Sequence, residues 1–178
     1  DTLKPYIDAG KLVCVSGQTE FEVVATPAWK SETAQARMDN ILTGYYPDAL
    51  TGGTKLDICL CSNDSTALGV TNSLVNFGYT AENIPVITGQ DCDVNNTKNM
   101  IAGLQAMSVF KDTRTLAAQT VQMVTDILEG KTPETNATYA NGVMDVPSFN
   151  CTPVFADLGN YEELLLESGY YTADQLAN

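Results

Sequence analysis

The sequence contains no histidine and few basic residues, and both shortages exclude classes of function. Without histidine, neither a histidine-dependent catalytic triad nor a histidine-ligated zinc site can form. Nine lysines and arginines stand against 22 aspartates and glutamates, which gives a formal net charge of −13. Because such a surface repels phosphate backbones, we expect no nucleic-acid partner.

Long apolar runs are also missing. A run such as Ile58–Cys61 is strand-sized and falls far short of the ~20 residues of a membrane helix, so we expect no transmembrane segment in this chain. The N-terminal stretch DTLKPYIDAG lacks the basic-then-apolar pattern of an export signal, so either a signal was removed or the chain begins inside a larger protein. The charged fraction of 17%, with much asparagine and threonine, favours an extracytoplasmic surface.

The cysteines form no CxxC pair, which argues against a metal or redox motif. Five are present: Cys14, Cys59, Cys61, Cys92 and Cys151. Cys59 and Cys61 alternate with apolar residues in an expected strand and point to one face of the sheet. We interpret them as buried thiols that act as small hydrophobic side chains, and we expect no metal site and no cofactor.

What the sequence does contain is an alternation of strand and helix patterns. A chain of 178 residues with 44% hydrophobic content can bury a well-packed core. Strands are expected over residues 11–17, 56–61, 84–89 and 104–110, and helices over residues 29–43, 64–77, 94–102 and 112–130. The tail is strand-like and then helical. This alternation predicts an α/β fold, with an open parallel β-sheet flanked by helices.

Three of the expected strands end in a polar residue. Asn63 follows the strand LDICLC, Asp91 follows IPVITG, and Lys111 follows LQAMSVF. Since parallel strands place their carboxyl ends on one edge of a sheet, an amide, a carboxylate and an ammonium group are expected to converge on one crevice.

This set of groups suits a neutral polyol, because each sugar hydroxyl both donates and accepts hydrogen bonds. Asn63 offers a carbonyl and an NH₂ group, Asp91 only accepts, and Lys111 only donates. The single tryptophan, Trp29, precedes a helix after a loop, and an indole face can stack on the C–H face of a sugar. We therefore take Trp29 as the candidate stacking platform.

Simpler interpretations exist for each residue taken alone. Asn63 and Asp91 are each placed to cap the helix that follows. A lysine before a helix is usually solvated, and a lone tryptophan is usually in the core. The repetition of the pattern at three consecutive strand ends favours a binding site.

Several motifs resemble the C-terminal half of the periplasmic sugar-binding proteins of ABC transporters, which are type I substrate-binding proteins. They are CSNDSTALG, VITGQDCD, GLQAMSVFKD, VPSFNCTPVF and YEELLLESGYYTADQL. Within the family, the chain is most similar to the xylose-binding and multiple-sugar-binding receptors. The resemblance implies that Asn63, Asp91 and Lys111 bond the sugar hydroxyls and that Trp29 stacks on the ring. The loop 44–54 departs from the pattern by looking longer.

The resemblance also implies an incomplete protein. Residues 1–178 would form the C-terminal sugar-binding lobe, the segment of about 111–131 and the tail would cross a hinge, and the N-terminal lobe would be absent. The expected function is the solute-binding component of a sugar ABC transporter, in the periplasm or lipid-anchored at the outer face of the membrane. It would bind a monosaccharide such as xylose, glucose or galactose between two lobes and deliver it to the permease.

Two other functions are weighed against this one. The effector-binding domain of a sugar-responsive transcription regulator would share the fold and carry a basic helix-turn-helix upstream, but the strongly acidic charge favours a receptor. A carbohydrate-acting enzyme would need a carboxylate pair such as Asp91 and Asp93. Those residues lie at a strand-to-helix junction where one is placed to cap the helix, and the sequence indicates no nucleophile, so we expect no enzyme.

Overall fold

The computed structural model describes residues 2–177. Its helices are α1 (Lys4–Asp8), α2 (Phe21–Val24), α3 (Ser31–Tyr45), α4 (Asp64–Phe77), α5 (Val94–Ile101), α6 (Thr113–Leu128) and α7 (Ala173–Leu176), with a 3₁₀ turn η1 (Pro27–Trp29) and a π-helical segment η2 (Glu162–Glu167). Its strands are β1 (Ile58–Cys59), β2 (Val86–Ile87), β3 (Ser108–Phe110), β4 (Ala137–Ala140), β5 (Asp145–Ser148) and β6 (Val154–Ala156).

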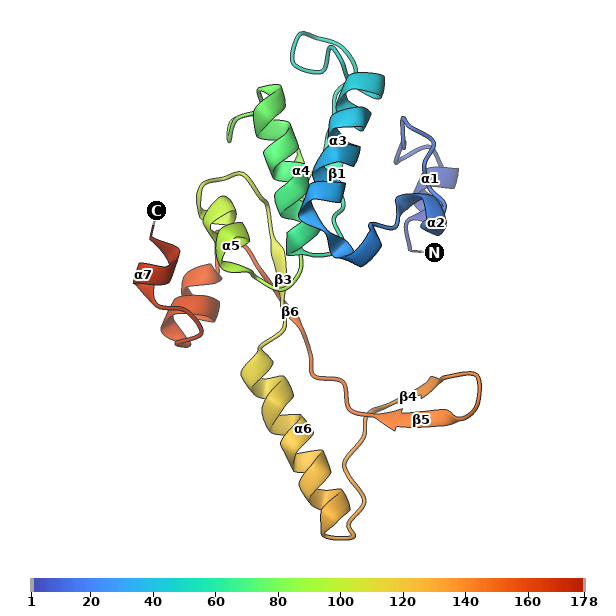
Figure 1. Ribbon diagram of the computed structural model, residues 1–178, viewed down its shortest axis with the longest axis vertical. Coiled ribbons are helices and arrows are strands. Elements are labelled where there is room, and N and C mark those ends of the chain that lie inside the picture. Colours follow the sequence, from blue (N-terminus) through green and yellow to red (C-terminus); the bar gives the residue numbers. More distant parts are fainter. Residues whose placement is uncertain (1, 178) are drawn as a thin grey trace.

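The central strands run parallel, as the alternation of strands and helices predicts. β1 pairs with β2 in parallel, and a parallel bridge between Gln90 and Val109 continues the sheet to β3. β3 then pairs antiparallel with β6. The direction of β6 follows from the path of the chain, which leaves the body after β3 through α6 and the β4–β5 hairpin and then returns (Figure 1).

A first hydrophobic core lies between α3, α4 and the sheet. Ala34, Met38 and Leu42 are buried on one face of α3, at the expected three- and four-residue spacing. The buried members of the core are Met38, Leu42, Tyr46, Leu56, Ala67, Leu74, Tyr79 and Ile87. α4 spans the predicted residues, and Gly78 ends it with a φ of 114° that favours glycine.

A second core lies on the other side of β3. Its buried members are Cys92, Met100, Phe110, Ala156 and Leu165, and Tyr161, Leu164, Tyr170 and Tyr171 pack against them. These residues come from the turn before α5, from α5, β3 and β6, and from η2 and its flanking residues. The part of the C-terminal tail from β6 onward therefore packs into the body.

The predicted strand over residues 11–17 is wrong, because this segment forms bends and turns. Its backbone makes local hydrogen bonds: the Leu12 N–H donates to the Tyr6 carbonyl, and the Gly17 N–H donates to the Cys14 carbonyl. The described residues give the segment no partner strand, and Val13 stays 76% exposed. Its alternating valines are not enough to keep this segment extended without a partner strand.

The helix predicted from Trp29 begins two residues later, at Ser31. The backbone is the cause, since Ala28 and Trp29 have φ values of 53° and 51° in the left-handed region. Two consecutive residues in that region cannot continue a right-handed helix. Trp29 is therefore placed on a turn that precedes α3.

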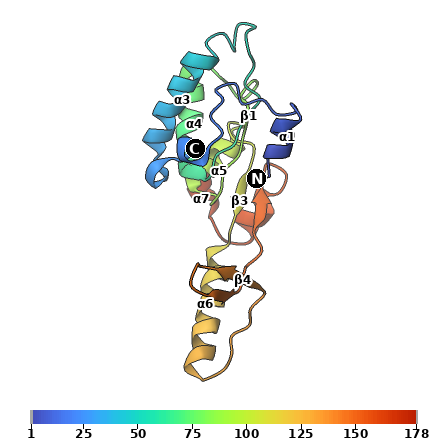
Figure 2. The same ribbon diagram turned by 90° about the vertical axis from the view of Figure 1, so that its right-hand side faces the viewer.

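α6 and the β4–β5 hairpin project from one end of the body (Figures 1 and 2). The apolar side chains of α6 that stay exposed are Leu116, Val121, Val124, Ile127 and Leu128. This apolar face does not fold back on the lobe, since these side chains are exposed. Among the described residues, no helix is long and apolar enough to cross a membrane.

Close packing of α3 on α4 depends on Gly69. A Cβ atom at this position would overlap the backbone carbonyl oxygen of Ser31. We expect Gly69→Ala to lower the free energy of unfolding by about 1–3 kcal/mol, because backbone must move to relieve the overlap. Urea unfolding measures this change. Gly44→Ala is the control: it lies in α3 with open space around it, so it should be neutral or stabilising by up to about 1 kcal/mol. Equal effects of the two substitutions would contradict the packing argument.

Candidate functional site

The three polar strand ends lie side by side at one edge of the sheet. The Asp64 N–H donates to the Gln90 carbonyl over 2.8 Å, and the Asp91 N–H donates to the Val109 carbonyl over 2.9 Å. These bonds join the segment after β1 to the segment after β2, and that segment to β3. α3 and α4 begin at the same end of the body, and α6 leaves from it (Figure 1).

Asp91 and Lys111 meet directly at this edge. The Lys111 Nζ lies 2.9 Å from the Asp91 Oδ1, and the two side chains are 39% and 38% exposed. An exposed ion pair of this kind stabilises a fold by at most about 1 kcal/mol. The pair leaves the second carboxylate oxygen of Asp91 and two of the three N–H donors of Lys111 available for a ligand. Neither residue plays the simpler role weighed for it, since Lys111 is not merely solvated and Asp91 does not cap α5.

Asn63 does cap the next helix. Its Oδ1 accepts hydrogen bonds from the Thr66 backbone N–H over 3.1 Å and from the Thr66 hydroxyl over 3.0 Å, while the Asn63 N–H donates back to that hydroxyl. The capping bonds occupy the side-chain carbonyl. None of the hydrogen bonds described for residues 2–177 uses the Asn63 NH₂ group, so toward a ligand Asn63 acts as a donor only.

Trp29 is not a core residue. Its side chain is 62% exposed on the turn before α3. Within residues 2–177, Trp29 takes part in none of the aromatic ring pairs. The turn that carries Trp29 leads directly into α3, whose start packs against Gly69 of α4. An exposed indole face is accessible to a ligand, so the stacking role of Trp29 stays a prediction.

Behind this edge lies the buried carboxylate of Asp64. Its Oδ1 accepts from the Ser108 hydroxyl over 2.9 Å and from the Gln105 amide over 3.1 Å, and its Oδ2 accepts from the Asp93 N–H over 2.8 Å. The side chain is fully buried, and burial raises the pKa of Asp64 to about 6, although its hydrogen bonds act in the opposite direction. Asp64 thus ties α4 to the turn that carries Asp91 and to β3.

Gly89 completes this arrangement. A Cβ atom at Gly89 would overlap the Asp64 carboxylate and the Gln105 amide. Neither Asp64 nor Gly89 is among the site residues predicted from the sequence. The sequence does place the polar Asp64 directly after Asn63 and Gly89 at the end of the next strand, but this pattern does not identify the contact between them.

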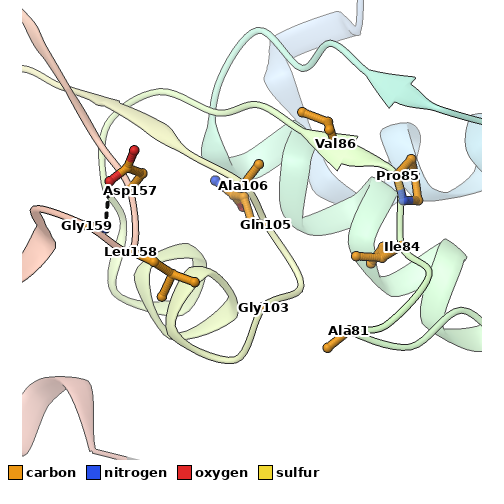
Figure 3. A pocket seen from close by; sticks show the side chains of 10 residues that line it. All are labelled: Ala81, Ile84, Pro85, Val86, Gly103, Gln105, Ala106, Asp157, Leu158 and Gly159. Carbon is orange, nitrogen blue, oxygen red and sulfur yellow. Dashed lines mark hydrogen bonds between the residues drawn. The ribbon is translucent and has the colours of Figure 1, made fainter.

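A separate cavity lies at the opposite edge of the sheet. It has a volume of about 420 Å³ and is lined by Ala81, Ile84, Pro85, Val86, Gly103, Gln105, Ala106, Asp157, Leu158 and Gly159 (Figure 3). Its polar groups are already engaged: Asp157 accepts from the Gly159 N–H over 2.7 Å, and the Gln105 side chain bonds Asp64 and Asn96. A smaller cavity of about 120 Å³ adjoins Lys111.

The two carboxylates of the pair weighed for an enzyme, Asp91 and Asp93, have different surroundings. Asp91 is bound to Lys111, and Asp93 occupies the N-cap position of α5 without a side-chain capping bond. Burial and the neighbouring Asp91 raise the pKa of Asp93. Within residues 2–177 no group of three or more cysteine, aspartate or glutamate side chains could hold a metal ion. Burial raises the pKa of the Cys59 and Cys61 thiols to about 12, which keeps both protonated.

The parallel strands and flanking helices have the fold of the periplasmic binding proteins. Residues 2–132 match the model of the periplasmic binding protein domain, and the chain belongs to this family. The family consists of binding proteins.

Two curated relatives match nearly the whole chain. The multiple sugar-binding periplasmic receptor ChvE of Rhizobium radiobacter is 49% identical over 98% of this chain and 49% of its own length. The D-xylose-binding periplasmic protein of Escherichia coli is 31% identical over 98% of this chain and 48% of its own length. The chain therefore spans about half the length of the curated relatives it matches.

A solved structure also matches nearly the whole chain over about half of its own length. An ABC transporter solute-binding protein from Clostridium phytofermentans, with bound β-D-glucose, is 56% identical and superposes with a TM-score of 0.91. The match covers 99% of this chain and 53% of that one. The expected family and fold class are confirmed.

The raised pKa of Asp64 predicts an unusual pH dependence. Because the folded-state pKa of about 6 exceeds the ordinary 3.8, the folded state binds more protons between these values than the unfolded state. The contribution of Asp64 to the free energy of unfolding should therefore fall as the pH rises from about 4 to 6. Carbon-13 NMR of labelled aspartates should show a carboxyl that titrates near pH 6. Ser108→Ala, which removes a bond to the charged form, should raise that midpoint further. Titration of every aspartate near pH 4 would contradict the prediction.

Proposed function

We propose that this chain is the C-terminal lobe of an extracytoplasmic solute-binding protein that binds a neutral monosaccharide and delivers it to the permease of a sugar ABC transporter. The observation that carries the proposal is the ion pair between Asp91 and Lys111 at the carboxyl edge of the sheet, beside the free amide of Asn63. The names of the relatives, which bind several sugars, xylose or glucose, support this class of ligand.

The chemistry of the edge fits sugar hydroxyls. The free oxygen of Asp91 accepts from one hydroxyl, while Lys111 and the Asn63 amide donate to others. Hydrogen bonds to charged groups are worth roughly 1.5–3 kcal/mol, so Asp91 and Lys111 dominate the polar recognition. Trp29 stacks on the C–H face of the ring, which accounts for its exposed indole. The lobe binds its ligand without chemical change.

The projecting part of the chain supports a second lobe. α6 and the β4–β5 hairpin leave the body at the edge where the candidate site lies (Figure 1). In our proposal, the segment of about 111–131 and the tail cross a hinge, and the N-terminal lobe of the same protein covers the exposed apolar face of α6. The sugar then lies between the lobes.

The receptor is favoured over the effector-binding domain of a transcription regulator. The relatives described above are periplasmic proteins or transporter components, and the chain carries a charge of −13. By the same reasoning we place the protein outside the cytoplasm, in the periplasm or lipid-anchored at the outer face of the membrane.

Substitutions of the ion pair test the site in the protein that contains both lobes. We expect Asp91→Asn and Lys111→Met each to weaken D-glucose or D-xylose binding by about 10- to 100-fold, because each removes a charged hydrogen-bonding group. Isothermal titration calorimetry measures the change. Lys55→Met is the matched control, since Lys55 forms a similar ion pair of 2.8 Å with Asp57 and is 80% exposed. Wild-type affinity in both site variants would overturn the proposal.

The isolated chain should bind sugar weakly. Its half of the site is open to water, which competes for each donor and acceptor. If the N-terminal lobe supplies ~4 kcal/mol, affinity falls by roughly a thousandfold, from micromolar to millimolar. Titration of this chain with xylose, glucose, galactose and arabinose provides the test. A micromolar dissociation constant for any of them would show that this lobe carries recognition alone.

A further inference from the structure

The turn that carries Asp91 has a strained backbone. Asp91 has a φ of 105° and Cys92 a φ of 54°, both in the region that favours glycine. Such conformations are energetically unfavourable for residues other than glycine and persist only where their surroundings fix them. The direction in which the Asp91 carboxylate points therefore depends on whatever holds this turn.

The backbone N–H groups of the turn are held from inside the body. Cys92 N–H donates to the Ser108 hydroxyl over 3.1 Å and Asp93 N–H donates to the Asp64 carboxylate over 2.8 Å, in addition to the bond from Asp91 to β3. The cysteine side chain is fully buried in the second core. These bonds hold the N–H groups of Asp91, Cys92 and Asp93 in place.

The carbonyl of Cys92 is held from the C-terminal tail. The Tyr171 hydroxyl donates to it over 2.8 Å, across 79 residues of sequence, and the Thr97 hydroxyl donates to it over 3.2 Å. Burial raises the pKa of Tyr171 to about 12, so this hydroxyl keeps its proton at any pH near neutrality. Tyr171 thus completes the fixation of the strained turn.

Tyr171 is itself supported by contacts that reach the other charged residue. Its ring packs edge-to-face on Tyr170 with centroids 4.9 Å apart, and Tyr170 packs the same way on Phe110 at 4.8 Å. Phe110 is the residue before Lys111. The guanidinium of Arg114 lies 5.2 Å from the centroid of the Tyr170 ring. Tyr171 therefore bonds the residue after Asp91, and Tyr170 packs on the residue before Lys111.

We propose that Tyr171, backed by Tyr170, is a positioning residue for sugar binding: its bond to the Cys92 carbonyl holds the strained turn so that Asp91 faces Lys111. This inference rests on the proposed function of Asp91 as a sugar ligand. Without the hydroxyl, the Cys92 peptide is free to relax toward negative φ, which turns the Asp91 carboxylate away from the ligand. Tyr171 does not touch the sugar.

The test is Tyr171→Phe in the two-lobed protein, with D-glucose and D-xylose as ligands. It removes one hydrogen bond and keeps the ring, so we expect affinity to fall about fivefold to tenfold in calorimetry. Tyr161→Phe is the matched control: Tyr161 packs on the same core, but its hydroxyl lies 3.2 Å from the surface residue Glu162. The control should stay within about twofold of wild type. Wild-type affinity in Tyr171→Phe would overturn the inference.

A double-mutant cycle separates positioning from general stability. In an Asp91→Asn background, Tyr171→Phe should cause no further loss, because it acts through Asp91. An additive loss would overturn the inference while leaving the proposed function intact. Wild-type affinity in the single variant Asp91→Asn would overturn the inference, and wild-type affinity in Lys111→Met as well would also overturn the proposed function. Should Tyr171→Phe unfold the protein, Thr97→Val removes the other bond to the same carbonyl and should show the same loss and the same coupling to Asp91.

Discussion

The buried carboxylate of Asp64 is the interaction on which the candidate site depends. A carboxylate removed from water is costly unless hydrogen bonds compensate it, and here the donors come from β3, from the segment before it and from the turn after β2. Each donor must stay in place, because the loss of any one leaves a buried acceptor unsatisfied. Because all of these donors bond one carboxylate, the segments that carry Asn63, Asp91 and Lys111 are held together. Fold stability and site geometry are thus two results of one constraint.

The sequence predicted the parts of the structure that local rules determine. The spacing of Ala34, Met38 and Leu42 identified the buried face of α3, and Gly78 marked the end of α4. The strand ends were predicted because parallel strands share an edge. The segment 11–17 was mispredicted because a strand pattern does not reveal whether a partner strand is present. Tyr171 was missed because its only link to the turn spans 79 residues, and no local pattern signals such a contact.

The candidate site divides its tasks among residues with different surroundings. Asn63 is committed to capping α4 through its carbonyl and keeps its amide for a ligand. Asp91 and Lys111 neutralise each other, which reduces the cost of holding either charge unpaired at this edge of the sheet. In the proposed complex, a sugar joins an existing charge pair and does not have to separate one. The proposed site would therefore favour neutral polyols over charged ligands.

The antiparallel pairing of β3 with β6 has a mechanical consequence for the projecting part of the chain. Both connections to α6 and the β4–β5 hairpin leave the body from one ladder, in which Phe110 pairs with Val154. Two strands tied side by side behave like a flat ribbon: they flex easily perpendicular to their common plane and resist bending within it. The part of the chain beyond Phe110 and Val154 is therefore expected to swing in one direction relative to the body more easily than in the other.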